Sequence, residues 1–465
     1  MSCEPSAKFD SASVDWQAFA AKLADISHST DPDTLTTKSR DFYWYSPILK
    51  SQLDRCRGDL LVTPSSEDEL LQVVRHCVEH RVPITVRGGG TGNYGQAVPL
   101  QGGVILETTK LNKVLEVGDG YARVQAGARI SAVDDAARQS GQEVLIYPST
   151  KRSATIGGFV AGGSAGIGSA RHGMLRDPGV IRRLRVVSCE APPRVIELTG
   201  DAVNHVHHAY GTNGIVTELE IALTPAEEWV QCLTLVDSYA QAIELCKATH
   251  AADIKAQLLA TVDARIVPMV KPLRGKVAAG KHLMLAILLR CDFERYRDLL
   301  PKFDAELAYS GDEAEFRRQG LPAITEFAYN HTTLQVLKVD KSITYLQVLF
   351  PSPVDTAKIE HFIELFGDEV LPHHEFVLAH GQLVAFAIPI IRYTTPERLY
   401  EIVDAFEAEG CPVFDPHTYV KEDGGMKQID PEQIAFKHEA DPLGLLNPGK
   451  LRGWPGFEEP PKVVT

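Results

Sequence analysis

The residues whose chemistry is most evident in this sequence are glycines that follow an arginine. Five of the eight residues from Gly88 to Gly95 are glycine, and Arg87 stands directly before them. Because glycine lets the backbone take positive φ and approach a ligand closely, successive N–H groups can face one concavity and bind an anion. The guanidinium of Arg87 can add a forked positive charge. We therefore interpret residues 87–95 as a cradle for a pyrophosphate group.

A second glycine-dense region, residues 147–173, also offers bare backbone and hydroxyl groups. Four apolar residues interrupt it, Ile156, Phe159, Val160 and Ile167, and a flexible linker would not usually contain them. We expect this region to make a second long contact with the same extended ligand.

The elements that must position the first loop form a predicted β-α-β unit. Apolar spacing predicts strands over 60–62 and 84–87 and a helix over 67–80, which Ser66 and Glu69 would begin as a capping box. Further along we predict strands over 104–107 and 123–126, a helix over 130–140, a hairpin over 181–187 and 194–198, a short helix ending near Tyr210, and a strand through Leu223.

Residues 229–409 change in character, because clustered glycines are few and the order β-α-β-β-α occurs twice. The first pass has predicted strands over 230–236, 256–262 and 282–289 and helices over 240–251 and 293–307; the second has strands over 343–350, 376–378 and 383–390 and helices over 356–366 and 396–409. Two ferredoxin-like units side by side would form an antiparallel sheet with helices on one face and a second face left for a pocket.

Composition narrows the class of partner. A chain of 465 residues suggests two or three domains. Its net charge of -14 disfavours nucleic acid and anionic membrane, so a small-molecule partner is favoured. The eight cysteines form no CxxC pair, the start of the chain lacks the pattern of a leader peptide, and no apolar run could span a membrane. We expect a reduced, cytoplasmic protein.

Three other kinds of site are disfavoured by context. Gly90 to Gly95 satisfies the GxGxxG string, but Pro99 and a glycine pair follow where a Rossmann site needs a helix. A GxxxxGK[ST] string is missing, which argues against a P-loop. The histidines at 205, 207 and 208 and at 373 and 374 have no acidic or cysteine partner at ligand spacing, so we expect no metal site.

Five motifs, taken in order, resemble the FAD-linked oxidases of the vanillyl-alcohol oxidase type, also called the PCMH type, to which the FAD-binding subunit of glycolate oxidase is similar. The motifs are residues 87–95, residues 148–158, Gly166 with Arg171-His-Gly173, residues 211–217, and Leu446-Asn-Pro-Gly-Lys450. Their order and spacing match from about residue 55 to 225 and again at the C-terminus.

The resemblance implies an α+β fold, in which a two-part PCMH-type FAD-binding domain, residues 1–228 and 410–465, is joined to a substrate-binding cap domain over 229–409. That cap would contain the antiparallel sheet of ferredoxin-like units covered by helices. The implied FAD contacts run from the pyrophosphate, through the residues toward the flavin ring, to the adenine end and the tail: Arg87, Gly88, Gly89, Gly90, Thr91, Gly92, Asn93, Tyr94, Pro148, Ser149, Thr155, Gly157, Gly158, Ala161, Gly163, Gly166, His172, Gly214, Ile215, Val216, Asn447 and Lys450.

Departures from the family pattern refine these expectations. Members that attach FAD through the first loop carry histidine where this chain has Thr91, so we expect FAD to be bound non-covalently. Relatives often have Arg-Tyr-Gly where this chain has His172, which leaves the role of that side chain open. The GDGNxH metal motif of related 2-hydroxyacid dehydrogenases does not occur in this sequence.

FAD would take a hydride at N5, while the protein orients the substrate and accepts its proton. Candidate proton acceptors are His417 and Tyr419 in the loop after the cap, and His331 within residues 329–333. Asn447 and Lys450 could donate to the polar edge of the flavin, and Arg392 could pair with a substrate carboxylate. For each side chain an ordinary structural role is the alternative.

We therefore predict an FAD-dependent oxidase or dehydrogenase that oxidises a small alcohol or 2-hydroxy acid. The alternatives are a flavin-binding protein without turnover, used for sensing or assembly, and a nicotinamide-dependent dehydrogenase. The sequence leaves open whether oxygen, a quinone or a carrier protein takes the electrons, and whether the chain forms a homo-oligomer.

Overall fold

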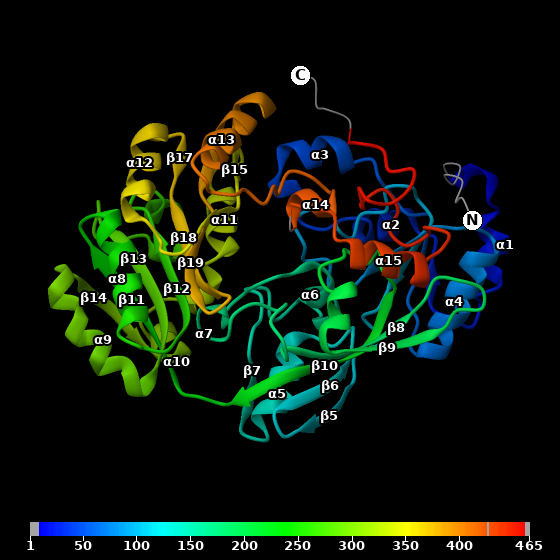
Figure 1. Cartoon of the computed structure of the whole chain (residues 1–465), viewed down its shortest axis with the longest axis horizontal. Helices are drawn as coiled ribbons and strands as arrows, with labels where there is room; N and C mark the ends of the chain where they lie inside the picture. Colours follow the sequence, from blue (N-terminus) through cyan, green and yellow to red (C-terminus); the bar gives the residue numbers. More distant parts are fainter. Residues whose placement is uncertain (1–8, 426, 461–465) are drawn as a thin grey trace.

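A computed structural model describes residues 9–425 and 427–460 of the chain. Its elements fall into two halves that lie side by side (Figure 1). One half contains the N-terminal elements, coloured blue to green, together with the red C-terminal segment. The other contains the elements between β11 and α13, coloured green to orange.

A small, mostly parallel sheet delivers the first glycine loop. Its order is β1-β2-β4-β3, with bounds His28–Ser29, Leu60–Val62, Val104–Glu107 and Ile84–Arg87. Helix α4 (Glu67–Glu79) is the crossover between β2 and β3, and its apolar side packs on the sheet. The predicted cap is confirmed in part: the Ser66 hydroxyl accepts from the N–H of Glu69, but the Glu69 carboxylate accepts from Ser65. The short helix α1 (Trp16–Ala21) precedes this sheet, and α2 (Pro32–Lys38) and α3 (Pro47–Leu53) lie between β1 and β2.

A six-stranded antiparallel sheet follows. The path β5-β6-β10-β8-β9 has bounds Val114–Gly118, Tyr121–Gln125, Ile215–Pro225, Ile181–Val187 and Val195–Thr199, and β7 (Gln142–Val144) also pairs with β10. Helices α5 (Ile130–Arg138) and α6 (Ile156–Gly162) share a core with one face of it. The short helix α7 (Ser169–His172) contacts β12 (Ala256–Val262) and β18 (His373–Ala379) of the other half. Strands β5 and β7 were not predicted, and the expected short helix is a 3-10 turn over Gly200–His205.

The second half is built on a seven-stranded antiparallel sheet, called the large sheet below. Its order is β14-β11-β13-β12-β18-β19-β16, with bounds Glu306–Gly311, Trp229–Val236, His282–Leu289, Ala256–Val262, His373–Ala379, Gln382–Ala387 and Val348–Phe350. The first four strands and the last three form two units that join through β12 and β18. A three-stranded sheet of β15 (Ile343–Tyr345), β20 (Ile390–Arg392) and β17 (Val370–Leu371) lies beside them.

Helices cover one face of the large sheet as predicted. They are α8 (Tyr239–Ala251), α9 (Phe293–Leu299), α12 (Thr356–Phe366) and α13 (Pro396–Ala408). The prediction of one helix over 293–307 is wrong, because the chain passes Pro301, turns at Asp304 with φ 47°, and adds β14 at the sheet edge.

The opposite face of the large sheet is not free, which corrects the expectation of an open face. Helices α10 (Glu313–Arg318) and α11 (Asn330–Leu337) pack on it together with aromatic residues from the other half, including Tyr94 and Tyr210. The sequence allows this because every residue of β12 is buried, so both faces of that strand are apolar enough to be covered.

The C-terminal segment returns to the first sheet (Figure 1). After α14 (Lys421–Gly424) and α15 (Pro431–Ala440), Leu446 forms a parallel bridge with Ile84, and the Asn447 N–H donates to the Ile84 carbonyl at 2.8 Å. Helix α15 begins as predicted: the Asp430 carboxylate accepts from the N–H groups of Glu432 and Gln433, and Pro431 is the first helical residue. None of the helices in residues 9–425 and 427–460 is long and apolar enough to cross a bilayer.

Candidate active site

The two glycine-dense regions meet in space. A Cβ placed on Gly88 would lie 2.1 Å from the Thr155 hydroxyl, and one on Gly89 would lie 2.3 Å from the Ser153 carbonyl oxygen. Two segments about 65 residues apart therefore contact each other through backbone, and only glycine fits at these positions of the first loop. The predicted convergence of the two regions is present in the fold.

Arg87 ends β3 and lies under the glycine loop. Its side chain is buried, one terminal nitrogen donates to the Arg40 carbonyl at 2.5 Å, and its Nε is buried without a hydrogen-bond partner. A Cβ on Gly90, whose φ is 64°, would collide with the Arg87 guanidinium at 2.0 Å. Burial lowers the pKa of Arg87, while Asp41 and Glu107 raise it. The loop therefore contains an incompletely paired buried cation, which suits a bound anion.

The tail motif holds this loop from the other side. The buried Lys450 ammonium donates to the carbonyls of Gly95, Gln96 and Val98 at 2.7 to 2.8 Å. Burial lowers the pKa of Lys450 to about 7, although Asp41 acts in the opposite direction. All three donors of the charged ammonium are engaged, so the predicted donation from Lys450 to a flavin finds no free N–H in this structure.

Asn447 acts beside Lys450 and keeps a free acceptor. Its Nδ2 donates to the carbonyls of Gln96 at 2.8 Å and Tyr210 at 2.5 Å, with the backbone in the left-handed region at φ 45°. Its Oδ1 is buried without a partner. Asn447 can therefore accept a hydrogen bond from a ligand but has little left to donate.

The remaining predicted cofactor contacts lie along the second region and at the start of β10. Thr155 begins α6, where its hydroxyl accepts from Gly158 N–H at 3.3 Å. Ile215 and Val216 pack their side chains into the cores of the two sheets, so they could meet a ligand only through backbone. His172 on α7 is half-buried. Burial, and to a smaller extent the positive charge of Arg171, lowers the pKa of His172 to about 4.

Several of the buried polar atoms without partners lie on elements on the two sides of the junction between the halves. On the side of the glycine loops they include Tyr210 Oη and Asn447 Oδ1; on the side of the large sheet they include Tyr329 Oη, Asn330 Oδ1 and Glu375 Oε1. Buried polar groups are normally hydrogen-bonded, so a concentration of exceptions indicates that a polar ligand completes the site. With the glycine cradle and Arg87, these atoms fit an extended molecule that carries phosphates and a polar ring.

The three predicted proton acceptors are not brought together. His417 is fully buried, and both ring nitrogens are engaged, Nδ1 with the Ser46 hydroxyl at 2.7 Å and Nε2 with the Tyr345 carbonyl at 2.8 Å. Burial lowers its pKa, so it is a neutral structural residue in this arrangement. Tyr419 packs beside Leu53 in a separate small cluster.

The other two predicted residues lie in the second half. His331 in α11 bonds the Thr325 carbonyl through Nδ1 at 2.8 Å, so its ring lies against the preceding 3-10 turn, Ile324–Glu326. Its neighbours Tyr329, Asn330 and Thr333 carry the unpartnered atoms instead. Arg392 is exposed at the end of β20, beside a small sheet rather than in the buried junction.

Sequence reasoning missed Glu375, Tyr345 and Gln96. Asn93 Nδ2 donates to Tyr345 Oη at 3.3 Å, which joins the glycine loop to the second half. Gln96 donates to the Gly162 carbonyl at 3.1 Å and thereby joins the two glycine regions. The sequence signal for Glu375 was an acid directly before the apolar residues Phe376 to Leu378 of a strand.

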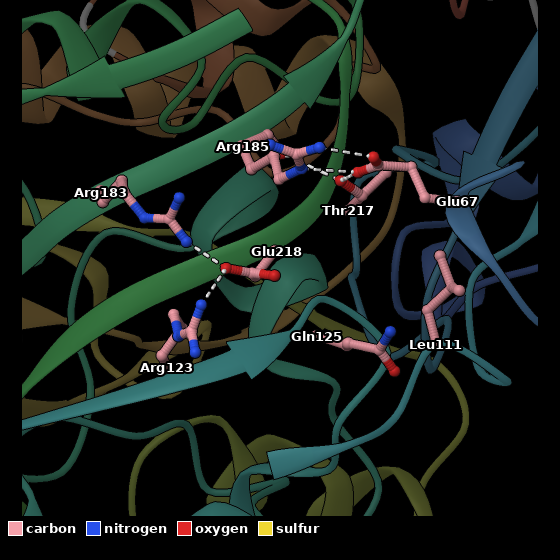
Figure 2. Close-up of a pocket in the computed structure, with 8 residues that line it drawn as sticks. All are labelled: Glu67, Leu111, Arg123, Gln125, Arg183, Arg185, Thr217 and Glu218. Carbon is pink, nitrogen blue, oxygen red and sulfur yellow. Dashed lines mark hydrogen bonds and ion pairs between the residues drawn. The ribbon is translucent and has the colours of Figure 1, made fainter. Parts of the chain in front are cut away.

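A charged hollow of about 350 Å³ lies elsewhere, between the start of α4 and the outer face of the six-stranded sheet (Figure 2). Arg185 binds both oxygens of Glu67 at 2.8 to 2.9 Å, and Arg183 and Arg123 both pair with Glu218. Because these arginines are already paired with carboxylates, we interpret the hollow as a set of ion pairs that links the two sheets of this half. We do not interpret it as the reaction site.

The histidines that invited a metal interpretation have other partners. His207 bonds the Gly163 carbonyl, His208 the Ser164 hydroxyl, His373 the Thr332 hydroxyl and His374 the Tyr239 hydroxyl. Within the described residues, three side chains that could approach one ion occur at the surface of α4: His76, Glu79 and His80.

Comparisons with known proteins agree with this geometry. Residues 58–191 match the family model described as FAD binding domain. The chain contains an FAD binding domain. It is 32% identical over 209 residues to a D-lactate dehydrogenase of Anaerostipes hadrus, covering 42% of each chain, and 30% identical over 200 residues to glycolate oxidase subunit GlcD of Bacillus subtilis, covering 40% of this chain and 42% of that protein. The chain thus spans less than half the length of the curated relatives it matches.

Solved structures extend the likeness over both halves of this flavoprotein. A 4-ethylphenol oxidase from Gulosibacter chungangensis has a TM-score of 0.68 at 15% identity and covers 94% of this chain and 98% of its own. A p-cresol methylhydroxylase with substrate bound has a TM-score of 0.67 at 16% identity, covering 93% of this chain and 95% of its own. The predicted PCMH-type α+β fold, the resemblance to the FAD-linked oxidases and the FAD cofactor are confirmed.

Proposed function

We propose that this flavoprotein is an FAD-dependent oxidoreductase that oxidises a small alcohol or 2-hydroxy acid. The observation that carries the proposal is the set of unpartnered buried polar atoms on both sides of the junction between the halves. A protein that only stored flavin would have no need of free polar groups on the large sheet facing the flavin half. The names of the relatives, which include a D-lactate dehydrogenase and a glycolate oxidase subunit, support a CH–OH donor.

FAD would be held by residues 1–228 and 410–465, and residues 229–409 would cover the substrate. Within this arrangement the loop from Arg87 to Tyr94 would bind the diphosphate, residues 148–166 would follow toward the ring, and residues 214–216 would lie at the adenine end. Because Thr91 offers no histidine for a bond to the flavin, we propose that FAD is bound non-covalently.

The chain's own residues would position the substrate and manage its proton. FAD bound here would supply the acceptor for the hydride that leaves the substrate carbon. The buried tyrosines at the junction would exclude water from the reacting atoms. A side chain of the protein must accept the proton of the substrate hydroxyl. Of the predicted acceptors, His331 retains one nitrogen outside its bond to Thr325. His417 would have to break a buried hydrogen bond first.

An anaerobic bleaching assay tests the proposal. The purified flavoprotein is mixed without oxygen with a panel of alcohols, phenols, D- and L-2-hydroxy acids and amines, and flavin absorbance is followed. We expect at least one alcohol or hydroxy acid to bleach the flavin completely. If the protein binds FAD but no compound in the panel reduces it, it is a flavin-binding protein without turnover and the proposal fails.

The seven cysteines of the described chain are all free, five of them buried. Free thiols persist in a reducing compartment. We therefore place the enzyme in the cytoplasm as part of this proposal.

A further inference from the structure

Glu375 is a buried acid on the face of the large sheet that meets the flavin half. It lies on β18 directly opposite Ala260 of β12, and Ala260 packs in the same core as Tyr94, Tyr329 and Tyr345. Its chain neighbours point the other way, since His374 and Phe376 pack among the helices. Glu375 is 7% exposed, and its Oε1 has no hydrogen-bond partner. The carboxyl therefore faces the junction with an unfilled acceptor position.

The groups around Glu375 form one polar cluster. Burial is the main cause that raises the pKa of Tyr329, and the nearby Glu375 carboxyl adds to it. Glu375 also contributes to the raised pKa of the Tyr94 phenol. Tyr329 Oη, Asn330 Oδ1 and Thr333 Oγ1 are buried without partners. Glu375 on β18 therefore adjoins Tyr329, and Asn330 and Thr333 carry further unsatisfied atoms in the first turn of the helix that Tyr329 begins, so a ligand with hydrogen-bonding groups would complete this region.

The backbone at Tyr329 is held in a sparsely populated conformation. Its φ of 54° and ψ of -146° lie in a region that glycine favours and tyrosine avoids. Such strain persists only where the surrounding structure imposes it, and it occurs most often at active sites and ligand-binding sites. The conformation starts α11 and orients the Tyr329 phenol toward the core that contains Ala260 and Tyr94.

Among the described residues, the cluster contains no cation that could receive a carboxylate. Burial alone raises the pKa of Glu375 well above its ordinary value. The titratable groups on the packed elements are neutral at pH 7: Tyr94, Tyr329, His373, whose pKa burial lowers to about 4, and His172 on α7. Arg171 pairs with Glu227 at 3.5 Å through Nη2 and lies over the Trp229 ring. Its Nη1 is buried without a partner, but its charge does not act on the pKa of Glu375, which burial alone raises, so Arg171 lies outside the cluster. An anion buried here would lack a partner, which is strongly unfavourable.

We propose that Glu375, Tyr329 and Asn330 form the polar end of the substrate site, where the Glu375 carboxyl hydrogen-bonds an uncharged hydroxyl group, so that the enzyme acts on uncharged alcohols or phenols in preference to 2-hydroxy acids. This inference rests on the proposed function and narrows its substrate class. A neutral carboxylic acid offers one donor and one acceptor, so it can both receive and give a hydrogen bond to an alcohol. The same pair of bonds cannot be made to a carboxylate anion without leaving its charge unpaired.

Matched substrates test the class. Benzyl alcohol is compared with mandelate, and 1-propanol with 2-hydroxybutyrate, in anaerobic reduction of the bound flavin. Each pair differs by one carboxylate. We expect the uncharged member to reduce the flavin at least tenfold faster in the pair that reacts. Faster reduction by the hydroxy acid would overturn the inference while leaving the proposed function standing; a flavin that no compound reduces would remove the proposed function itself.

The variant Glu375→Gln gives a readout that needs no turnover. A raised folded-state pKa means that the stabilisation from the protonated group is complete below the unfolded value near 4.5 and is lost as pH rises toward the folded value. Relative to Glu375→Gln, the wild-type apoprotein should therefore lose up to tenfold in its folding equilibrium constant per pH unit above pH 5. Unfolding in urea between pH 5 and 8 measures this, with exposed Glu364→Gln as the matched control.

Glu375→Leu then separates binding from folding. We expect FAD content equal to that of the wild type and a loss of at least a hundredfold in reduction by the preferred alcohol, while Glu364→Gln reduces normally. Identical pH dependence of unfolding in Glu375→Gln and wild type, or unchanged reduction in Glu375→Leu, would contradict the assignment of Glu375.

Discussion

Single residues show which parts of the site a sequence can reveal. Arg87 and the glycines after it were predicted as site residues from residue type alone, because a run of residues without Cβ at the end of a strand is typical of a loop that binds an anion through its backbone. Lys450 was also predicted as a site residue, but the acceptors of its hydrogen bonds were not predicted. Its ammonium donates to three carbonyls of the loop. Glu375 was missed because one acid in a buried strand is visible as unusual only when its facing groups are known.

Lys450→Met should weaken the apoprotein and release the cofactor. The change removes a donor from three carbonyls: those of Gly95 and Val98 lose their Lys450 bond, and that of Gln96 keeps only its bond from Asn447, which we expect to cost about 3 kcal/mol of unfolding free energy. Urea unfolding and the ratio of FAD absorbance to protein absorbance measure both effects. Exposed Lys338→Met is the control and should change stability by less than about 0.5 kcal/mol. An unchanged midpoint for Lys450→Met would refute the role assigned to this lysine.

At the scale of elements, strongly amphipathic pieces were predicted well and weak ones poorly. Helix α4 has a capping serine and an apolar stripe, so its predicted and observed starts coincide at Glu67. Strand β14 was missed, and its first two residues were assigned to the helix predicted over 293–307, because its residues are mostly only partly buried and show no clear alternation. Strand β5 was missed for the same reason, since an edge strand faces solvent and needs fewer apolar residues.

Gly89→Ala tests the contact between the two glycine regions. The added Cβ would lie 2.3 Å from the Ser153 carbonyl oxygen, so one loop must move, and we expect a cost of about 2 kcal/mol and at least a tenfold weaker affinity for FAD. Titration of apoprotein with FAD, followed by quenching of flavin fluorescence, gives the affinity. Gly141→Ala is the control: its φ is 73° but nothing lies within 4 Å, so it should lose about 1 kcal/mol and keep its affinity. Equal affinities would show that the contact is dispensable.

For the whole molecule, the order of the elements along the chain could be predicted, but the way in which distant segments pack against one another could not. The repeated β-α-β-β-α order predicted the large sheet, and two units do join in it. The covering of its second face depends on aromatics from distant segments, such as Tyr45, Tyr94 and Tyr210, whose meeting no local pattern reports. The return of Leu446 to Ile84 follows from the resemblance in the tail motif and not from periodicity.

The proposed function depends on non-covalent binding of FAD by backbone groups and side chains. The direct measurement is to purify the protein from cells supplied with riboflavin, record its flavin spectrum, and precipitate it with acid. We predict a yellow protein with equimolar FAD, all of which stays in the supernatant as free FAD. A yellow pellet would contradict non-covalent binding, and a colourless protein that takes up no FAD would contradict the site itself.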